Sequence, residues 1–386
     1  MIAWLLAVPV LRFGVADIDI SPPEPLPLGG YTARQGKTSE PGGKPLLARV
    51  LVLKQGDSTL AIASLDMLTV PESLYEEVAK RLPGIKALFL VATHTHSAPD
   101  SQMLNRRMNF AVPGIASFRE RWLEWYADRI AKGILSTKPT QSISELRIEE
   151  RRLAANKGRR AGAVPDTLGS RLSSGSNHLL FHYAAHATVL DERNLKTDPD
   201  WPGLVRDWGA LLPGAIGDVA PASGELGDMR KLLRKPVPYI ESVVWNQKQY
   251  SFAYVETQIG LDAVSANPAF AAQNKIPAAL ATTLVSKFAP SIGKVSAFRL
   301  GKLAVVGIPG EPTSAIGRDI RDYGRRIGFT SVLVVSHVNG WIGYILKPDD
   351  YDRGGYEASL AFHGRLTGDK VTEAAESALN QLAGRP

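Results

Sequence analysis

Short apolar runs bounded by turn residues recur along the chain and alternate with segments of helical periodicity. The strand-like runs cover residues 48–54, 59–66, 87–92, 179–185, 295–306 and 331–335, and the helical segments cover residues 71–82, 117–135, 202–212, 313–327 and 369–382. This mixture predicts an α/β fold of mixed, layered β-sheets flanked by helices. Residues 226–274 have weak periodicity and many turn residues, which predicts loops or an insertion.

The clearest helical segment covers residues 117–135. Its large apolar residues recur at helical spacing and predict a face that packs on the core: Phe118, Trp122, Tyr126, Ile130 and Ile134. Ser117 and Glu120 fit a capping box, which predicts that the helix begins between them.

Length and composition favour one large catalytic unit. The chain has 386 residues, of which 44% are hydrophobic and 22% charged, and this excludes disordered and fibrous classes. No internal repeat or linker is visible, so residues 12–386 are predicted to form a single domain. The absence of Cys excludes disulfides, thiolate metal sites and a Cys nucleophile. The net charge of +7 favours anionic surfaces but is too small for a nucleic-acid-binding protein.

Residues 1–11 form an apolar N-terminal segment that is too short to span a membrane. The segment resembles the apolar region of a signal peptide, but no basic residue precedes it and no clear cleavage site follows. We expect an edge strand or a tail, which leaves the protein cytoplasmic. The alternative is the remnant of a signal, which would make the protein secreted or periplasmic.

Two histidines follow the apolar run at residues 87–92. His94 and His96 are two residues apart, and side chains at this spacing share one face of a strand. Both imidazoles can then reach one metal ion, or one can bind the metal while the other addresses a substrate. We therefore predict a functional site at the end of this strand.

A second group of histidines lies at a spacing of four, which fits one face of a helix or of a strand. No Glu follows His182, so the zincin His-Glu-x-x-His helix is excluded. The β-branched and aromatic content favours a strand that carries His186 at its end. His178 and His182 are expected to be structural.

Two later stretches offer oxygen donors. Glu311 lies at a strand-to-helix junction, where it either faces the site or favours the positive end of the helix dipole. Tyr344, Tyr351 and Tyr356 lie in a loop rich in Gly and Asp, where they either serve the site or pack the loop.

These stretches, in this order, resemble the catalytic domain of the neutral (non-lysosomal) ceramidases, zinc-dependent hydrolases of the N-acyl bond of ceramide. The resemblance covers roughly residues 12–365. The matching stretches are residues 14–23 with the Gly-Gly-Tyr turn at 29–31, Thr-His-Thr-His-Ser at 93–97, Tyr-Ala-Ala-His-Ala-Thr at 183–188, Gly-Asp-Val at 217–219 with Pro221, Pro-Gly-Glu at 309–311, and the tyrosine loop with Tyr356-Glu357.

The resemblance implies one Zn²⁺ ion with four protein ligands: His94, His186, Glu311 and Tyr344. Imidazole and carboxylate suit zinc, and a phenolate is a plausible fourth donor. A water molecule activated by the metal would then attack the amide carbonyl.

The resemblance also implies that His96, Tyr356 and an arginine orient the amide and hydroxyl groups of the substrate. The Asn-x-x-Arg pattern of the family fits Arg159, and Arg160 lies beside it. The group that transfers the proton is left open.

Three departures from the family pattern bear on the substrate. Ala220 replaces the Ser of the Gly-Asp-Val-Ser-Pro motif, which excludes a Ser nucleophile at that position. Asp100 lies where ceramidases have a Gly, and we expect it to place a charge near the site. The chain ends near the helix that closes the catalytic domain, so the C-terminal immunoglobulin-like domain of the family is expected to be missing.

The predicted activity is therefore hydrolysis of an N-acyl amide bond in ceramide or a related N-acyl lipid. One alternative is a zinc esterase or lactonase, because the same activated water would attack an ester. The other is a metal-containing binding module without catalysis. Basic clusters at residues 151–152, 157–160 and 230–235 are typical of solvated faces, and the alternative is a patch that contacts an anionic membrane. The oligomeric state is left open.

Overall fold

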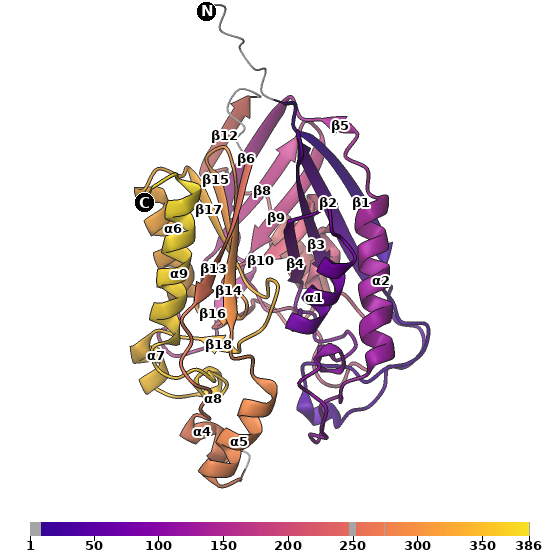
Figure 1. Cartoon of the computed structure of the whole chain (residues 1–386), viewed down its shortest axis with the longest axis vertical. Coiled ribbons are helices and arrows are strands. Elements are labelled where there is room, and N and C mark those ends of the chain that lie inside the picture. Colours follow the sequence, from indigo (N-terminus) through magenta and orange to yellow (C-terminus); the bar gives the residue numbers. More distant parts are fainter. Residues whose placement is uncertain (1–8, 247–251, 274, 386) are drawn as a thin grey trace, which may run out of the picture.

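The residues that the structure describes form three β-sheets of four or five strands and two short two-stranded sheets (Figure 1). The structure is a computed structural model, and it describes residues 9–246, 252–273 and 275–385. The first sheet has the order β4-β3-β2-β1-β5. Its strands are β1 (Arg12–Asp19), β2 (Leu47–Gln55), β3 (Ser58–Leu65), β4 (Ala87–Ala92) and β5 (Gln141–Ser142).

The second sheet has the order β10-β9-β8-β6-β12, and the third has the order β13-β14-β15-β17. The strands of the second are β6 (Glu145–Arg152), β8 (Leu168–Ser174), β9 (Asn177–Tyr183), β10 (Ala210–Pro213) and β12 (Glu241–Asn246). Those of the third are β13 (Phe252–Ile259), β14 (Gly293–Leu300), β15 (Leu303–Gly307) and β17 (Ser331–Val335). The short sheets pair β7 (Asn156–Gly158) with β11 (Val219–Pro221), and β16 (Glu311–Pro312) with β18 (Tyr344–Ile345).

Helices cover the outer faces of the sheets. Figure 1 shows α6 and α9 on one side of the sheets and α1 and α2 on the other, with α4, α5, α7 and α8 towards one end. The α-helices are α1 (Glu72–Lys80), α2 (Glu120–Ser136), α3 (Leu226–Arg234), α4 (Pro268–Gln273), α5 (Ala278–Phe288), α6 (Ser314–Arg326), α7 (Pro348–Asp352), α8 (Tyr356–Ser359) and α9 (Thr367–Leu382). Short 3-10 helices are η1 (Thr32–Arg34), η2 (Ser101–Leu104) and η3 (Trp201–Trp208). This arrangement confirms the predicted α/β class.

The central core lies where the three sheets meet. Successive side chains of a strand point to opposite faces, so Phe89 of β4 enters this core while Leu90 faces the helices. The ring of Phe89 meets the ring of Phe298 from β14 edge-on, with centroids 5.4 Å apart. Ile148 of β6 brings the second sheet into the same cluster. All six residues of β4 are buried, because both of its faces are covered.

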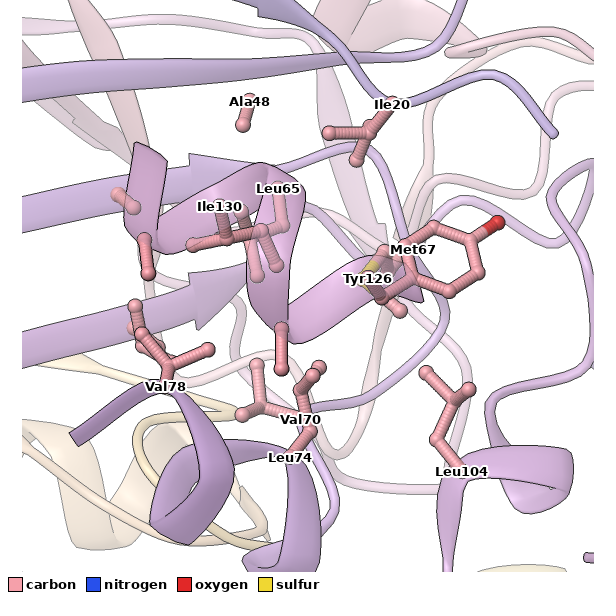
Figure 2. Close-up of a cluster of buried hydrophobic side chains, with 14 of the residues drawn as sticks. Ile20, Ala48, Leu65, Met67, Val70, Leu74, Val78, Leu104, Tyr126 and Ile130 are labelled. Atoms are coloured by element: carbon pink, nitrogen blue, oxygen red, sulfur yellow. The ribbon is translucent and has the colours of Figure 1, made fainter. Parts of the chain in front are cut away.

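The other face of the first sheet packs against α1 and α2. Figure 2 shows Leu74 and Val78 of α1 and Ile130 of α2 pointing into this cluster beside Leu65 of β3. These four side chains are fully buried. Each contributes about 1.5–3 kcal/mol through removal of its apolar surface from water. The outer faces of the second and third sheets are covered in the same way, by η3 with α3 and by α6 with α9.

Three predicted segments differ from the structure. Residues 295–306 form a hairpin of β14 and β15, because Gly301 (φ +58°) turns the chain between Leu300 and Leu303. Residues 202–212 begin in η3 but end in β10, which pairs with β9. Residues 226–274 are not mainly loops: α3, β12, β13 and α4 lie within them. β12 and β13 have weak periodicity because each lies at the edge of its sheet.

The predicted capping box at α2 is wrong. The helix begins at Glu120 with Arg119 at its N-cap, and no side chain caps it. The hydroxyl of Ser117 instead donates to the Phe110 carbonyl, since an irregular segment precedes the helix. The aromatic face of α2 is confirmed, because Trp122, Tyr126 and Ile130 are buried.

The N-terminal segment is described only in part. Residues 1–8 of the apolar segment 1–11 lie outside the described residues. Leu11 is buried in the central core just before β1. Among the helices of the described ranges, none has the length and apolar character required to cross a bilayer.

Candidate metal centre

One strand from each of the three sheets carries a histidine just beyond its carboxyl end. His94 follows β4, His186 follows β9 and His337 follows β17. Each of these strands runs parallel to a neighbour in its sheet. In such sheets the carboxyl ends of strands are where ligands bind. The three imidazoles gather there: the ring of His94 lies 4.8 Å from that of His186 and 4.1 Å from that of His337.

The backbone turns sharply at two of these strand ends. His94 (φ +64°) and His337 (φ +59°) adopt the left-handed conformation, which costs about 1–3 kcal/mol for a residue with a side chain. The amide of His94 donates to the Met67 carbonyl, and that of His337 donates to the Gly310 carbonyl. The surrounding segments thus hold both histidines in strained conformations that bring their rings against each other.

Backbone carbonyls determine which imidazole nitrogens are free. The Nδ1–H of His94 donates to the Leu68 carbonyl at 2.7 Å, and the Nδ1–H of His186 donates to the Val219 carbonyl at 2.9 Å. A neutral imidazole has one N–H, so the Nε2 atom of each ring keeps its lone pair. This is the arrangement by which proteins orient histidine ligands of metals.

Glu311 brings a carboxylate to the same point. It begins β16, where it is paired with Tyr344 of β18. The indole N–H of Trp341 donates to its Oε1 atom at 3.0 Å. Its Oε2 atom is buried without a hydrogen-bond partner and lies 3.2 Å from His186 Nε2 and 3.7 Å from His94 Nε2. Glu311 therefore faces the site and does not cap a helix.

Burial determines the charges of these groups. It lowers the pKa of His94, and it lowers the pKa of His186 to about 3, so both rings are neutral at pH 7. Burial alone would raise the pKa of Glu311, but the histidines around it outweigh this effect and hold that pKa well below its usual value. The acceptor atoms of these three groups, which together carry one negative charge, thus face one another. Atoms that bind one zinc ion tetrahedrally at about 2.0–2.2 Å lie about 3.3–3.6 Å apart, so the spacing fits a cation.

Tyr344 and Arg159 lie on one side of this group. The Tyr344 hydroxyl is 3.5 Å from His186 Nε2, and the Arg159 guanidinium donates to it at 2.8 Å. Burial and the Glu311 carboxylate raise the pKa of Tyr344 well above its usual value. Burial lowers the pKa of Arg159, but the Tyr344 and Glu311 oxygens outweigh this effect and raise it overall. Arg159 is thus a fixed positive charge beside the carboxylate.

The neighbouring arginine has a different role. Arg160 donates to the Glu357 carboxylate at 2.8 Å and to the Asp350 carbonyl, which links it to α7 and α8. Glu357 also pairs with the Nε atom of Arg159 at 3.0 Å. Of the two arginines, Arg159 therefore lies at the site and Arg160 supports the tyrosine loop.

Tyr356 connects the site to solvent. It begins α8, its side chain is 55% exposed, and its ring lies 5.8 Å from the ring of Tyr344. Arg159 lies under the same ring, with its guanidinium carbon 5.8 Å from the ring centre. Tyr351, the third tyrosine of the loop, is half-buried and packs against the small cluster around Tyr344.

His96 lies beside His94, with 3.2 Å between their Nε2 atoms. The ring of Tyr31 packs against it at 4.8 Å. Gly30 (φ +87°) is required here, because a Cβ atom would lie 2.3 Å from His96 Nδ1. The buried guanidinium of Arg34 donates to the carbonyls of His96 and Gly29 and holds this turn in place.

The Gly-Asp-Val segment, residues 217–219, contacts site residues through its backbone carbonyls. The carbonyl of Gly217 accepts from Arg159 at 2.9 Å, and the carbonyl of Val219 accepts from His186. The carboxylate of Asp218 accepts from the backbone and hydroxyl of Ser314 at the start of α6. The segment thus positions site residues through its backbone.

Asp100 is predicted to place a charge near the site, and in the structure its carboxylate contacts backbone amides of the following loop. Its carboxylate is buried and accepts from the backbone amides of Gln102 and Ala116. It therefore caps η2 and ties down the loop before α2. His178 and His182 are structural as expected: the first bonds to the Ser173 hydroxyl and the second to the Val334 carbonyl.

The structure brings together all seven residues of the predicted site: His94, His96, Arg159, His186, Glu311, Tyr344 and Tyr356. Sequence reasoning missed His337, Trp341 and Arg34. His337 follows an apolar strand just as His94 does, so the same pattern could have found it. Trp341 and Arg34 act through contacts between distant segments, for which the sequence carries no local signal.

Fold and site together define an α/β protein with a candidate metal centre at the ends of its strands. No protein-family model matches the sequence. A segment of 84 residues is 34% identical to the neutral ceramidase of Mycobacterium tuberculosis. This segment covers 21% of the present chain and only 13% of that relative.

Solved structures extend the similarity to the whole fold. The neutral ceramidase of Pseudomonas aeruginosa superimposes with a TM-score of 0.77 at 18% identity, over 98% of this chain and 75% of that one. A structure described as ceramidase complexed with C2 gives a TM-score of 0.78 at 17% identity, over 98% and 76% of the two chains. These findings confirm the resemblance to the neutral ceramidases: the chain has their fold and shares a segment of related sequence.

Proposed function

We propose that the protein is a zinc-dependent hydrolase that cleaves an N-acyl amide bond in ceramide or a related N-acyl lipid. One observation carries the proposal. The Oε2 atom of Glu311 is buried without a hydrogen-bond partner between His94 Nε2 and His186 Nε2, both of which carry lone pairs. Three acceptors facing one another need a cation between them.

His94, His186, Glu311 and Tyr344 would hold the zinc ion. Imidazole, carboxylate and phenolate oxygen are donors that zinc accepts. The hydroxyl of Tyr344 lies 3.5 Å from His186 Nε2. When bound, zinc would polarise the carbonyl of the substrate and lower the pKa of a water molecule.

The other site residues act on the substrate. His96 is held by Arg34 and Tyr31 beside the ligand His94, so an N–H of His96 can donate to an oxygen that becomes negative during the reaction. Arg159 supplies a fixed positive charge beside the Tyr344 hydroxyl. Tyr356, with its half-exposed ring, can bind the substrate at the edge of the site.

The substrate class follows from the relatives. Both solved structures and the curated relative are ceramidases, and the present fold covers about three quarters of the solved chains. The residues that match the family motifs lie together around one point of the fold. Residues 12–386 would then be the catalytic unit, with an N-acyl lipid as the substrate.

Metal analysis is the first test. Protein purified without added metal is compared with His94→Ala, Glu311→Ala and a control, His182→Ala, which removes a buried histidine outside the site. We expect near-stoichiometric zinc in the parent and the control and none in the two site variants. Failure of the parent to bind zinc even when it is supplied would overturn the proposal.

The bond that is cleaved needs a second test. Ceramides and other N-acyl amides are offered beside esters with the same acyl chain. Faster turnover of the amides, lost in Glu311→Ala, supports amide hydrolysis. Preference for the esters would indicate an esterase or lactonase, and zinc binding without turnover of either would indicate a binding module.

A further inference from the structure

His337 has no explanation in the four-ligand site. Its side chain is fully buried, and neither Nδ1 nor Nε2 has a hydrogen-bond partner. Among the described histidines, no other has both ring nitrogens without a partner. His182 and His363 are also buried, but each bonds through one nitrogen to a backbone carbonyl. A buried polar ring without partners is costly, so a group that the polypeptide does not supply is expected beside it.

The position of the ring identifies that group. The ring of His337 stacks on that of His94, with centroids 4.1 Å apart and planes 18° from parallel. One nitrogen of His337, one of His94 and one oxygen of Glu311 all lie within 4.8 Å of one another. These are the same His94 and Glu311 that face His186 across the proposed zinc position. One nitrogen of His337 thus belongs to the same group of candidate donor atoms as His94 and Glu311.

The backbone holds His337 at this position. Its amide donates to the Gly310 carbonyl, directly before Glu311, and its carbonyl accepts from the Ala92 amide at the end of β4. His337 is therefore tied to both segments that carry the proposed ligands His94 and Glu311. Its left-handed conformation (φ +59°) is maintained by these two bonds.

We infer that His337 is a further ligand of the metal, so that the centre of this protein contains three imidazoles, from His94, His186 and His337, with Glu311. Tyr344 then adds a second oxygen donor, 3.5 Å from His186 Nε2. The inference rests on the proposed function, because it concerns the same metal centre. A set of three imidazoles and a carboxylate binds Zn²⁺ and other late first-row divalent metals strongly.

The test compares His337→Phe with the parent protein. Phenylalanine keeps a flat ring against His94 but removes the ligand nitrogen. X-ray absorption of the zinc-loaded proteins counts the imidazoles around the metal, and competition with a chelator gives the zinc affinity. We expect one imidazole fewer in the variant and an affinity lower by more than about 10-fold, the smallest loss typical of residues that only orient a ligand.

Two further variants keep the outcome interpretable. His182→Phe changes a buried histidine of the adjacent strand and is expected to leave both readouts as in the parent. His337→Asn, which tolerates the left-handed backbone, is used if the phenylalanine variant unfolds, as judged by circular dichroism. An unchanged imidazole count in a folded His337 variant would overturn the inference and leave the proposed function intact. Absence of zinc from the parent would instead overturn the proposed function.

Discussion

The two carboxylate oxygens of Glu311 have different surroundings because of Trp341. Its indole N–H bonds Oε1, which leaves Oε2 facing the lone pairs of His94 and His186. A carboxylate with one oxygen fixed in this way cannot rotate freely, so its second oxygen stays directed at the metal position. The orientation of Glu311 thus depends on an indole that is outside the proposed set of ligands.

Trp341→Phe removes that hydrogen bond and retains most of the ring. We expect the affinity for zinc to fall by about 10–100-fold, because Glu311 becomes free to turn. Competition with a chelator measures the change. Trp125→Phe on α2 serves as the control, since Trp125 packs against Tyr126 away from the site. Equal affinities in the two variants would contradict the role given to Trp341.

Arg159 and Arg160 are neighbouring arginines with different contacts, so the same substitution can be compared at the two positions. Arg159→Lys loses the hydrogen bonds to Tyr344 and Gly217 because lysine lacks the planar fork of donors. We expect kcat/KM for an N-acyl amide to fall about 100-fold, as for the loss of a donor to a developing charge. Arg160→Lys, which affects the contacts with Glu357 and Asp350, is expected to have a much smaller effect. The reverse order would assign the site arginine to Arg160.

At the scale of the elements, the buried carboxylate of Glu77 connects α1 to a neighbouring loop. Glu77 accepts hydrogen bonds from Lys80 and Arg81 of its own helical region and from Arg106 of the loop after η2. These bonds lower the pKa of Glu77 to about 2. The network therefore joins α1 to the loop that leads into α2.

The lowered pKa has a consequence for stability. A carboxyl group with a pKa lower in the folded than in the unfolded state stabilises the fold above its unfolded pKa, and the contribution is lost as the pH falls through the folded value. Glu77→Gln should therefore lower the free energy of unfolding at pH 7 by about 1–2 kcal/mol, less than the shift alone gives because Lys80 and Arg106 are solvent-exposed. Urea unfolding from pH 7 to pH 2 should show the difference shrinking below about pH 4.5. A difference independent of pH would contradict this role.

At the scale of the whole molecule, the candidate metal centre lies between the three sheets. Each sheet contributes one histidine from beyond a strand end, and the same strands meet in the central core. A metal bound by ligands from all three sheets would stabilise the complete fold and not one element. Unfolding of any sheet would separate the ligands.

Zinc is therefore expected to raise the melting temperature of the whole transition. Free zinc at 100 times its dissociation constant adds about 2.7 kcal/mol to the free energy of unfolding. Calorimetry of metal-free and zinc-loaded protein should show one transition that moves to higher temperature. His94→Ala should show no such shift. A shift confined to a partial transition would mean that the sheets unfold independently.

Contact with an anionic membrane stays a prediction of the sequence. Some residues of the basic clusters have partners within the chain. Arg151 and Arg234 lie over the ring of Trp208, and Arg234 also pairs with Asp207. Binding to anionic vesicles that is abolished by salt would support membrane contact.

The sequence by itself determined several of the central strands, the longest helices and the identity of most residues of the candidate site. Local patterns of hydrophobicity and residue type were enough to find the run at 87–92 with His94 and His96, and the junction at Glu311. Such patterns can be recognised without knowing which distant segments are in contact. The tertiary structure alone decided the edge strands β12 and β13, the choice of Arg159 over Arg160, and the burial of Asp100. It also placed His337 against His94. The physical reason is common to all of them: each depends on which segments pack side by side, and pairing between residues far apart in sequence leaves no local pattern.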